Sequence, residues 1–243
     1  MPLDAADGRL RGDYAQALAD ITGNDLGVDV AAWREWWSFH EKNWRKPDKK
    51  ANHAFKTQEG GFFGIPLWSK RLSFILDLSQ GMARVMPEGG GASKVDAARK
   101  ELMQALTHLS EGAKFNVIYF GTEVRPLSKQ LIPAKKNVLQ QAFEFIKKQQ
   151  PAGRTNFYDA LGQAFEDDEV DTLYVLSEGA PNEGVYFNKT EILDRVVQLN
   201  RYRKLVLHCV EIGEQADKTW TGFFKDLVDR TGGVHVQLGV KQK

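Results

Sequence analysis

The stretch that decides the fold is Arg71-Leu-Ser-Phe-Ile-Leu-Asp77-Leu-Ser-Gln-Gly-Met82, in which an apolar run ends abruptly in polar residues. A short run rich in large apolar side chains and bounded by turn-forming residues predicts a strand that is buried on both faces. Similar runs follow along the chain, at 115–120, 172–177, 205–210 and 234–238. Five buried strands are therefore expected.

Helix-length amphipathic stretches separate these runs, at about 94–110, 134–149, 157–166, 189–203 and 217–231. Alternation of this kind predicts parallel strands joined by right-handed crossovers. The expected fold class is α/β, with a doubly wound, mostly parallel sheet flanked by helices. Residues 62–67 are a candidate edge strand, because Pro66 would be tolerated at an edge.

The composition is that of an ordinary globular protein, with 42% hydrophobic residues among 243. Thirty-three Lys and Arg against 32 Asp and Glu give a formal charge of +1, so no overall field attracts nucleic acid or anionic lipid. The single cysteine, Cys209, excludes a disulfide framework. No secretory signal or membrane-spanning run is apparent, and the compartment stays open because the chain is compatible with a fragment of a longer protein.

The pattern of apolar residues changes near residue 69. Before it, apolar residues recur at helical spacing from Tyr14 to Ile21, and four of the six tryptophans lie close together, at Trp33, Trp36, Trp37 and Trp44. This pattern predicts a helical hairpin. The predicted organisation is a helical, Trp-rich extension over 1–50, a linker with the edge-strand candidate over 51–68, and an α/β domain over 69–243.

Polar residues follow the predicted strands where ligands bind in doubly wound sheets, outside the carboxyl ends of the strands. Asp77 and Ser79 follow the first strand, Thr155 precedes the helix at 157–166, and Glu178 follows the strand at 172–177. Carboxylate and hydroxyl oxygens suit a hard cation such as Mg²⁺. The four side chains are therefore candidate metal ligands. A structural alternative is that Asp77 and Thr155 cap backbone N–H groups at helix starts.

Catalytic alternatives are weaker. An aspartyl-nucleophile phosphohydrolase would also place Asp77 after the first strand, but Ser79 stands where that chemistry needs a second acid. The histidines lack the spacing of a metal site or of a nucleophile–base pair, and we interpret His208 and His235 as hydrogen-bonded strand residues. No enzymatic activity is predicted.

The segments Asp77-Leu-Ser-Gln-Gly81, Gly153-Arg-Thr-Asn-Phe-Tyr-Asp-Ala-Leu161 and Tyr174-Val-Leu-Ser-Glu-Gly-Ala-Pro181 together resemble the von Willebrand factor type A domain. That family carries a metal-ion-dependent adhesion site, built from D-x-S-x-S after the first strand, a threonine from a second loop and an aspartate after the fourth strand. Asp77, Ser79 and Thr155 match this pattern.

Two residues depart from the family pattern: Gly81 stands where the second serine belongs, and Glu178 where the aspartate is usual. The resemblance thus implies a degenerate site, in which Asp77, Ser79, Thr155 and Glu178 would hold Mg²⁺, or alternatively Mn²⁺ or Ca²⁺. A carboxylate of a partner protein would complete the coordination.

Residues 18–37 resemble the segment that joins α-helical HEAT-type repeats to a type A domain in some bacterial proteins. This resemblance implies that the tryptophans dock the last helical unit onto the sheet domain. The expected function is a protein–protein binding module of the adhesion type, with another protein as partner and without nucleic-acid or membrane binding. A metal-independent scaffold of a HEAT-repeat protein is the alternative, and a metal-dependent phosphohydrolase is a distant third. The oligomeric state is left open.

Overall fold

The computed structural model describes residues 2–45, 61–86, 91–213 and 218–239. Most of the predicted linker lies outside the described residues. The helices are α1 (Pro2–Ala5), α2 (Gly8–Thr22), α3 (Val30–His40), α4 (Lys94–Thr107), α5 (Lys136–Lys148), α6 (Phe157–Phe165), α7 (Lys189–Arg203) and α8 (Phe223–Thr231), with 3₁₀ turns η1 (Gln80–Ala83) and η2 (Lys218–Trp220). The strands are β1 (Arg71–Asp77), β2 (Lys114–Phe120), β3 (Val124–Pro126), β4 (Ile132–Pro133), β5 (Thr172–Ser177), β6 (Val206–Ile212) and β7 (His235–Leu238).

The strands form one seven-stranded sheet in the order β3-β2-β1-β5-β6-β7, with β4 also paired to β2. The five predicted strands are confirmed, and all of them pair in parallel. The short strands β3 and β4 were not predicted. They run antiparallel to β2, and each ends in a proline, which only an edge strand accommodates.

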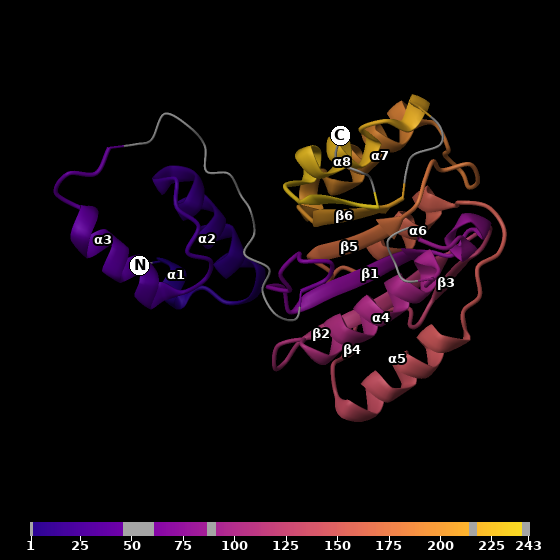
Figure 1. The fold of residues 1–243 in the computed structure, drawn as a ribbon, viewed down its shortest axis with the longest axis horizontal. Coiled ribbons are helices and arrows are strands. Elements are labelled where there is room, and N and C mark those ends of the chain that lie inside the picture. Colours follow the sequence, from indigo (N-terminus) through magenta and orange to yellow (C-terminus); the bar gives the residue numbers. More distant parts are fainter. Residues whose placement is uncertain (1, 46–60, 87–90, 214–217, 240–243) are drawn as a thin grey trace.

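Helices cover both faces of the sheet (Figure 1). One core lies between the sheet and helices α4 and α5, where strand residues such as Phe74 and Val117 meet Leu102 and Ile146. A second core lies between the opposite face and helices α6, α7 and α8. Because successive strand residues point to opposite faces, β1, β2, β5 and β6 each contribute to both cores, whereas β7 at the edge contributes to the first alone. The doubly wound α/β fold is confirmed.

The strand order reverses at β1, because β2 lies on one side of it and β5 on the other. In an open α/β sheet this switch point leaves a crevice at the carboxyl ends of the central strands. Asp77 is the last residue of β1, and Ser177 the last of β5. The fold therefore positions the candidate ligands at the crevice.

Two local predictions differ from the structure. Residues 62–67 form no edge strand of the sheet: Phe62 and Ile65 pair with each other across a tight turn. The helix predicted over 217–231 begins only at Phe223, because Gly222 adopts a left-handed conformation, with φ of 76°, that interrupts helical hydrogen bonding.

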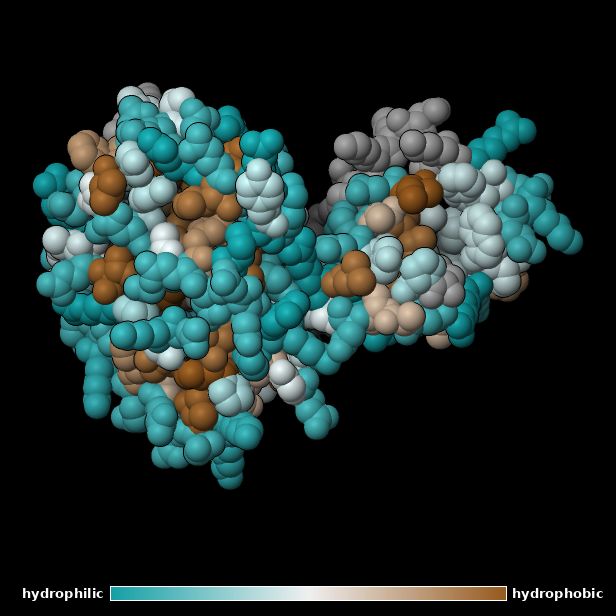
Figure 2. Space-filling view, turned by 180° about the vertical axis from the view of Figure 1, so that it is seen from behind, coloured by the Kyte–Doolittle hydropathy of each residue, from teal (hydrophilic) through white to brown (hydrophobic). Residues whose placement is uncertain are grey.

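The N-terminal helices form a second, smaller lobe beside the α/β domain (Figure 2). Trp33 is its centre: it packs with Leu3 and Ala15, and its indole N–H donates to the Gly27 carbonyl at 2.8 Å. Trp33 thus packs within the extension, and the expectation that the tryptophans dock it onto the sheet domain was wrong for this residue. On the face shown, apolar side chains surface as separate small groups between hydrophilic ones.

The extension contacts the α/β domain through α2 instead. Gly12 lies against the ring of Trp68, where a Cβ would overlap the indole. The Arg9 guanidinium donates to the carbonyls of Asp171 at 3.2 Å and Lys204 at 2.5 Å, which lie one residue before β5 and two residues before β6. The extension therefore lies at the amino ends of the strands, opposite the crevice.

The histidine interpretation is confirmed, since Nδ1 of His208 accepts from the Val234 N–H at 3.1 Å and Nε2 of His235 lies 3.1 Å from Glu211 Oε2. Burial, assisted by the nearby Arg9 charge, lowers the pKa of His208 to about 3. Below about pH 6.5, His208 is therefore protonated in the unfolded chain but stays neutral in the folded chain. Stability from this group is complete above pH 6.5 and is lost as the pH falls toward 3.

In the unmodified chain, His208 should lower the free energy of unfolding by about 1.4 kcal/mol for each pH unit below the unfolded pKa, or about 2 kcal/mol between pH 7.5 and 5. We expect His208→Gln to remove this part of the pH dependence. Urea unfolding at the two pH values measures this difference. His108→Gln, at an exposed position after α4, is the control and should leave the pH dependence as in the unmodified chain. Equal behaviour of the two variants would contradict the assignment.

Candidate functional site

Asp77 links the tips of the two central strands. It is 1% exposed, and its Oδ1 accepts from the Ser79 N–H at 2.7 Å. Its Oδ2 accepts from the Ser177 hydroxyl at 2.6 Å and from the Glu178 N–H at 3.3 Å. Burial raises the pKa of Asp77, and the hydrogen bonds from Ser177 and Ser79 oppose this shift. Both oxygens are thus engaged within the protein, as in the structural alternative for this residue.

Backbone hydrogen bonds join the loop after β1 to the loop before α6. The Gln80 N–H donates to the Gly153 carbonyl at 3.1 Å, and the Ala152 N–H donates to the Leu78 carbonyl at 2.7 Å. Thr155 is 5% exposed and is fixed by a reciprocal pair: its N–H donates to Asn182 Oδ1 at 2.9 Å, while the Asn182 N–H donates to its carbonyl at 3.1 Å. Three loops from distant parts of the chain therefore form one framework.

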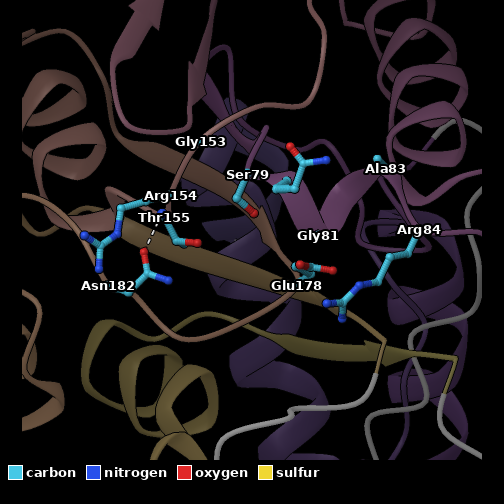
Figure 3. Close-up of a pocket in the computed structure, with 10 residues that line it drawn as sticks. Ser79, Gly81, Ala83, Arg84, Gly153, Arg154, Thr155, Glu178 and Asn182 are labelled. Atoms are coloured by element: carbon cyan, nitrogen blue, oxygen red, sulfur yellow. Dashed lines mark hydrogen bonds between the residues drawn. The ribbon is translucent and has the colours of Figure 1, made fainter.

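A pocket of about 400 Å³ opens between these loops. Ser79, Thr155 and Glu178 line it, together with Arg84 and Arg154, which the sequence analysis did not single out. Figure 3 shows the side chains of Ser79, Thr155 and Glu178 around a common space, with the Arg84 guanidinium extending toward Glu178. Asp77 does not line the pocket, so the structure brings three of the four predicted ligands to its surface.

Glu178 is already paired. Its Oε2 accepts from the Lys94 ammonium at 2.6 Å, and the two side chains are only 14% and 10% exposed. Its Oε1 lies in the space that a side chain at position 81 would fill, because a Cβ on Gly81 would overlap this oxygen. The two departures from the family pattern are thus coupled: Gly81 has no side chain, and the longer carboxylate of Glu178 occupies the space that this leaves.

The donor set can be tested against a divalent cation. The hydroxyls of Ser79 and Thr155 suit such an ion, but both oxygens of Asp77 are engaged and the Glu178 charge is balanced by Lys94. In the part of the chain that the structure describes, no three His, Cys, Asp or Glu side chains are grouped as a metal site. The observed arrangement therefore does not fit a divalent cation, and the ion at Asp77, Ser79, Thr155 and Glu178 stays a prediction from the sequence.

Comparison with known proteins identifies the fold. The family model for the von Willebrand factor type A domain matches residues 70–234 of the sequence. The chain belongs to this family. Among curated proteins, it is 29% identical over 140 residues to inter-alpha-trypsin inhibitor heavy chain H1 of Mesocricetus auratus, which covers 53% of this chain and 14% of that protein. It is 25% identical over 142 residues to human von Willebrand factor A domain-containing protein 3B, covering 58% of this chain and 10% of that protein.

Solved structures agree on the type A fold. A von Willebrand factor type A protein from Catenulispora acidiphila superposes with a TM-score of 0.57 at 20% identity, over 69% of this chain and 38% of that one. Proximal thread matrix protein 1 from the mussel byssus, described with a zinc-occupied adhesion motif, gives 0.51 at 15% identity, over 69% and 41%. The match thus spans a small part of the curated relatives and about two fifths of these structures. No described helix is both long and apolar enough to cross a membrane.

Proposed function

We propose that this type A domain is a protein–protein binding module whose pocket at the carboxyl ends of β1 and β5 receives an acidic side chain of a partner protein. The observation that carries the proposal is a pocket lined by charged and hydroxyl side chains, which hydrogen-bonded loops form at the switch point of the sheet. The family relationship supports a binding role for the site. Because the chain spans little of its curated relatives, the partner cannot be taken over from them.

The charges that line the pocket favour an anionic group. Arg84 and Arg154 supply guanidinium groups, while Glu178, the one carboxylate among the described lining residues, is balanced by Lys94. Arg154 contacts Glu183 at 3.4 Å, but its side chain is 63% exposed, so this contact costs little to exchange. Guanidinium groups bind carboxylates with two parallel hydrogen bonds, which gives direction as well as affinity.

Exposed apolar side chains lie close in sequence to residues that line the pocket. Val185 and Phe187, in the loop that continues from Asn182, are 69% and 60% exposed, and Val85, next to Arg84, is 59% exposed. Apolar contacts beside a polar centre are a common arrangement in protein interfaces, where a few such residues contribute most of the binding energy. These residues would pack against the partner around its acidic group.

The test compares proteins captured from source-cell extract by the immobilised chain and by its variants. We expect Arg84→Ala/Arg154→Ala to weaken capture of a specific partner by roughly 10- to 100-fold, as the loss of a charge-assisted contact predicts. Phe187→Ala should weaken it as well. Tyr202→Ala, on an 84% exposed side chain at the far end of α7, is the control and should retain the partner. A partner retained equally by all variants would contradict the proposal.

A second candidate function is a metal-independent scaffold role of the N-terminal extension. It rests on Phe39 and Trp37 of α3, which are 77% and 44% exposed. If Phe39→Ala abolishes capture while the pocket variants retain it, this candidate replaces the first. A phosphohydrolase finds no support at Asp77, which is buried and whose two oxygens both accept hydrogen bonds within the protein.

A further inference from the structure

A buried ammonium lies beside the pocket where the family pattern places a metal ion. Lys94 is the first residue of α4, where the positive end of the helix dipole disfavours a cation. It is nevertheless only 8% exposed and bonded to Glu178 at 2.6 Å. We infer that Lys94 replaces the divalent cation: its ammonium, paired with Glu178, balances the carboxylate that a metal ion would otherwise neutralise, so that the pocket binds its partner without a metal ion.

A glycine leaves space for each member of the Lys94–Glu178 pair. Gly81 leaves the space that Oε1 of Glu178 occupies. Gly213, in the loop after β6, does the same for the amine, because a Cβ there would lie 2.5 Å from Nζ of Lys94. Any side chain at either position would displace the carboxylate or the ammonium. The Lys94–Glu178 pair thus depends on α4 and on the segments that follow β1, β5 and β6, unlike a chance contact of two surface side chains.

This pair and a divalent cation exclude each other. An ion bound to the remaining oxygen of Glu178 would share one carboxylate with an ammonium, and like charges separated by a single carboxylate repel strongly. Asp77 offers no compensation, since its oxygens already accept from Ser79, Ser177 and Glu178. The ion would have to displace Lys94 from a site where both side chains are largely withdrawn from water.

The inference deepens the proposed function and rests on it only for the role of the charge in partner binding. The ion measurements below need no partner, so they fail or succeed independently of the capture experiment. If the pocket binds no partner, the proposed binding function is refuted. If the pocket binds Mg²⁺, the inference that Lys94 replaces the metal ion is refuted.

The first test uses the unmodified chain and titrates it with Mn²⁺ in a calorimeter, followed by thermal unfolding in about 10 mM Mg²⁺, Mn²⁺ or Ca²⁺ against chelator. A ligand of the folded state raises the melting temperature according to its concentration relative to Kd. We expect no binding heat and no shift beyond about 1 °C. Saturable Mn²⁺ binding, or an increase of several degrees, would overturn the inference.

The second test restores the family pattern with Gly81→Ser/Lys94→Met/Glu178→Asp. We expect this variant to gain a shift of roughly 5 to 10 °C in about 10 mM Mg²⁺, as an ion at a hundred times its Kd would give. The matched control, Gly81→Ser/Lys100→Met/Glu178→Asp, removes an exposed lysine of the same helix and should gain none. A folded triple variant without a shift, or a control that shifts equally, would overturn the role of Lys94. If the triple variant does not fold, the titration of the unmodified chain decides.

Discussion

Replacing Lys94 by methionine should lower the free energy of unfolding by about 3 kcal/mol. The substitution keeps the length and apolar stem of the side chain, but it leaves the Glu178 carboxylate largely buried without its partner charge. Removing one member of a buried ion pair is costly because the other remains desolvated and uncompensated. Urea unfolding at neutral pH measures the loss, and the slope of the transition should stay unchanged if the native fold is kept.

Two further variants separate the pair from the helix that carries it. Lys100→Met changes an exposed residue further along α4 and should alter stability by less than about 0.5 kcal/mol. Lys94→Met/Glu178→Gln removes both charges and should recover most of the loss. If Lys94→Met were as mild as Lys100→Met, or if the double variant were the least stable of all, the pair would not have the role assigned to it.

Phe157→Ala should be the most damaging single change near the pocket, with a loss of about 3 to 5 kcal/mol in the free energy of unfolding. Phe157 is fully buried at the start of α6, and its ring packs edge-to-face on Phe120, Phe223 and Phe224, with centroids 6.0, 5.5 and 5.8 Å away. It anchors the loop that ends two residues earlier in Thr155. The cavity left by its removal would therefore both destabilise the core and loosen that loop.

Thermal and urea unfolding give the size of this effect, and partner capture at low temperature reports the state of the loop. Phe187→Ala is the matched control for stability, since the same side chain is removed from a 60% exposed position, and it should cost less than about 0.5 kcal/mol. Similar losses for Phe157→Ala and Phe187→Ala would refute the anchoring role.

Most of the α/β domain could be predicted because strands buried on both faces leave a strong sequence signal. The strands β1, β2, β5 and β6 face two cores, so runs such as 115–120 and 172–177 are mostly apolar. The rule that ligands gather at the carboxyl ends of such strands then placed Ser79, Thr155 and Glu178 together, as the pocket shows. Strands β3 and β4 were not predicted, because a strand of two or three residues at the edge of a sheet is too short to show a periodic pattern.

The charge balance of the site could not be predicted from the sequence. Lys94 lies 84 residues before Glu178, and only the tertiary fold brings them to 2.6 Å. A lysine in the first turn of a helix, against the dipole, was the one available signal. The effect of Gly81 is also spatial, since its lack of a side chain matters only because Glu178 fills the space. The docking of the extension through Arg9 and Trp68 likewise depends on surface shape.

The bonds of Arg9 to the residues just before β5 and β6 have a mechanical consequence. They attach the extension to one end of the parallel strands, while the pocket opens at the other end, roughly 20 Å away for a strand of this length. A pulling force between a captured partner and the N-terminal lobe would thus run along the strand axes. The backbone ladder between β1 and β5 would be loaded in shear, with its hydrogen bonds resisting together instead of opening one at a time.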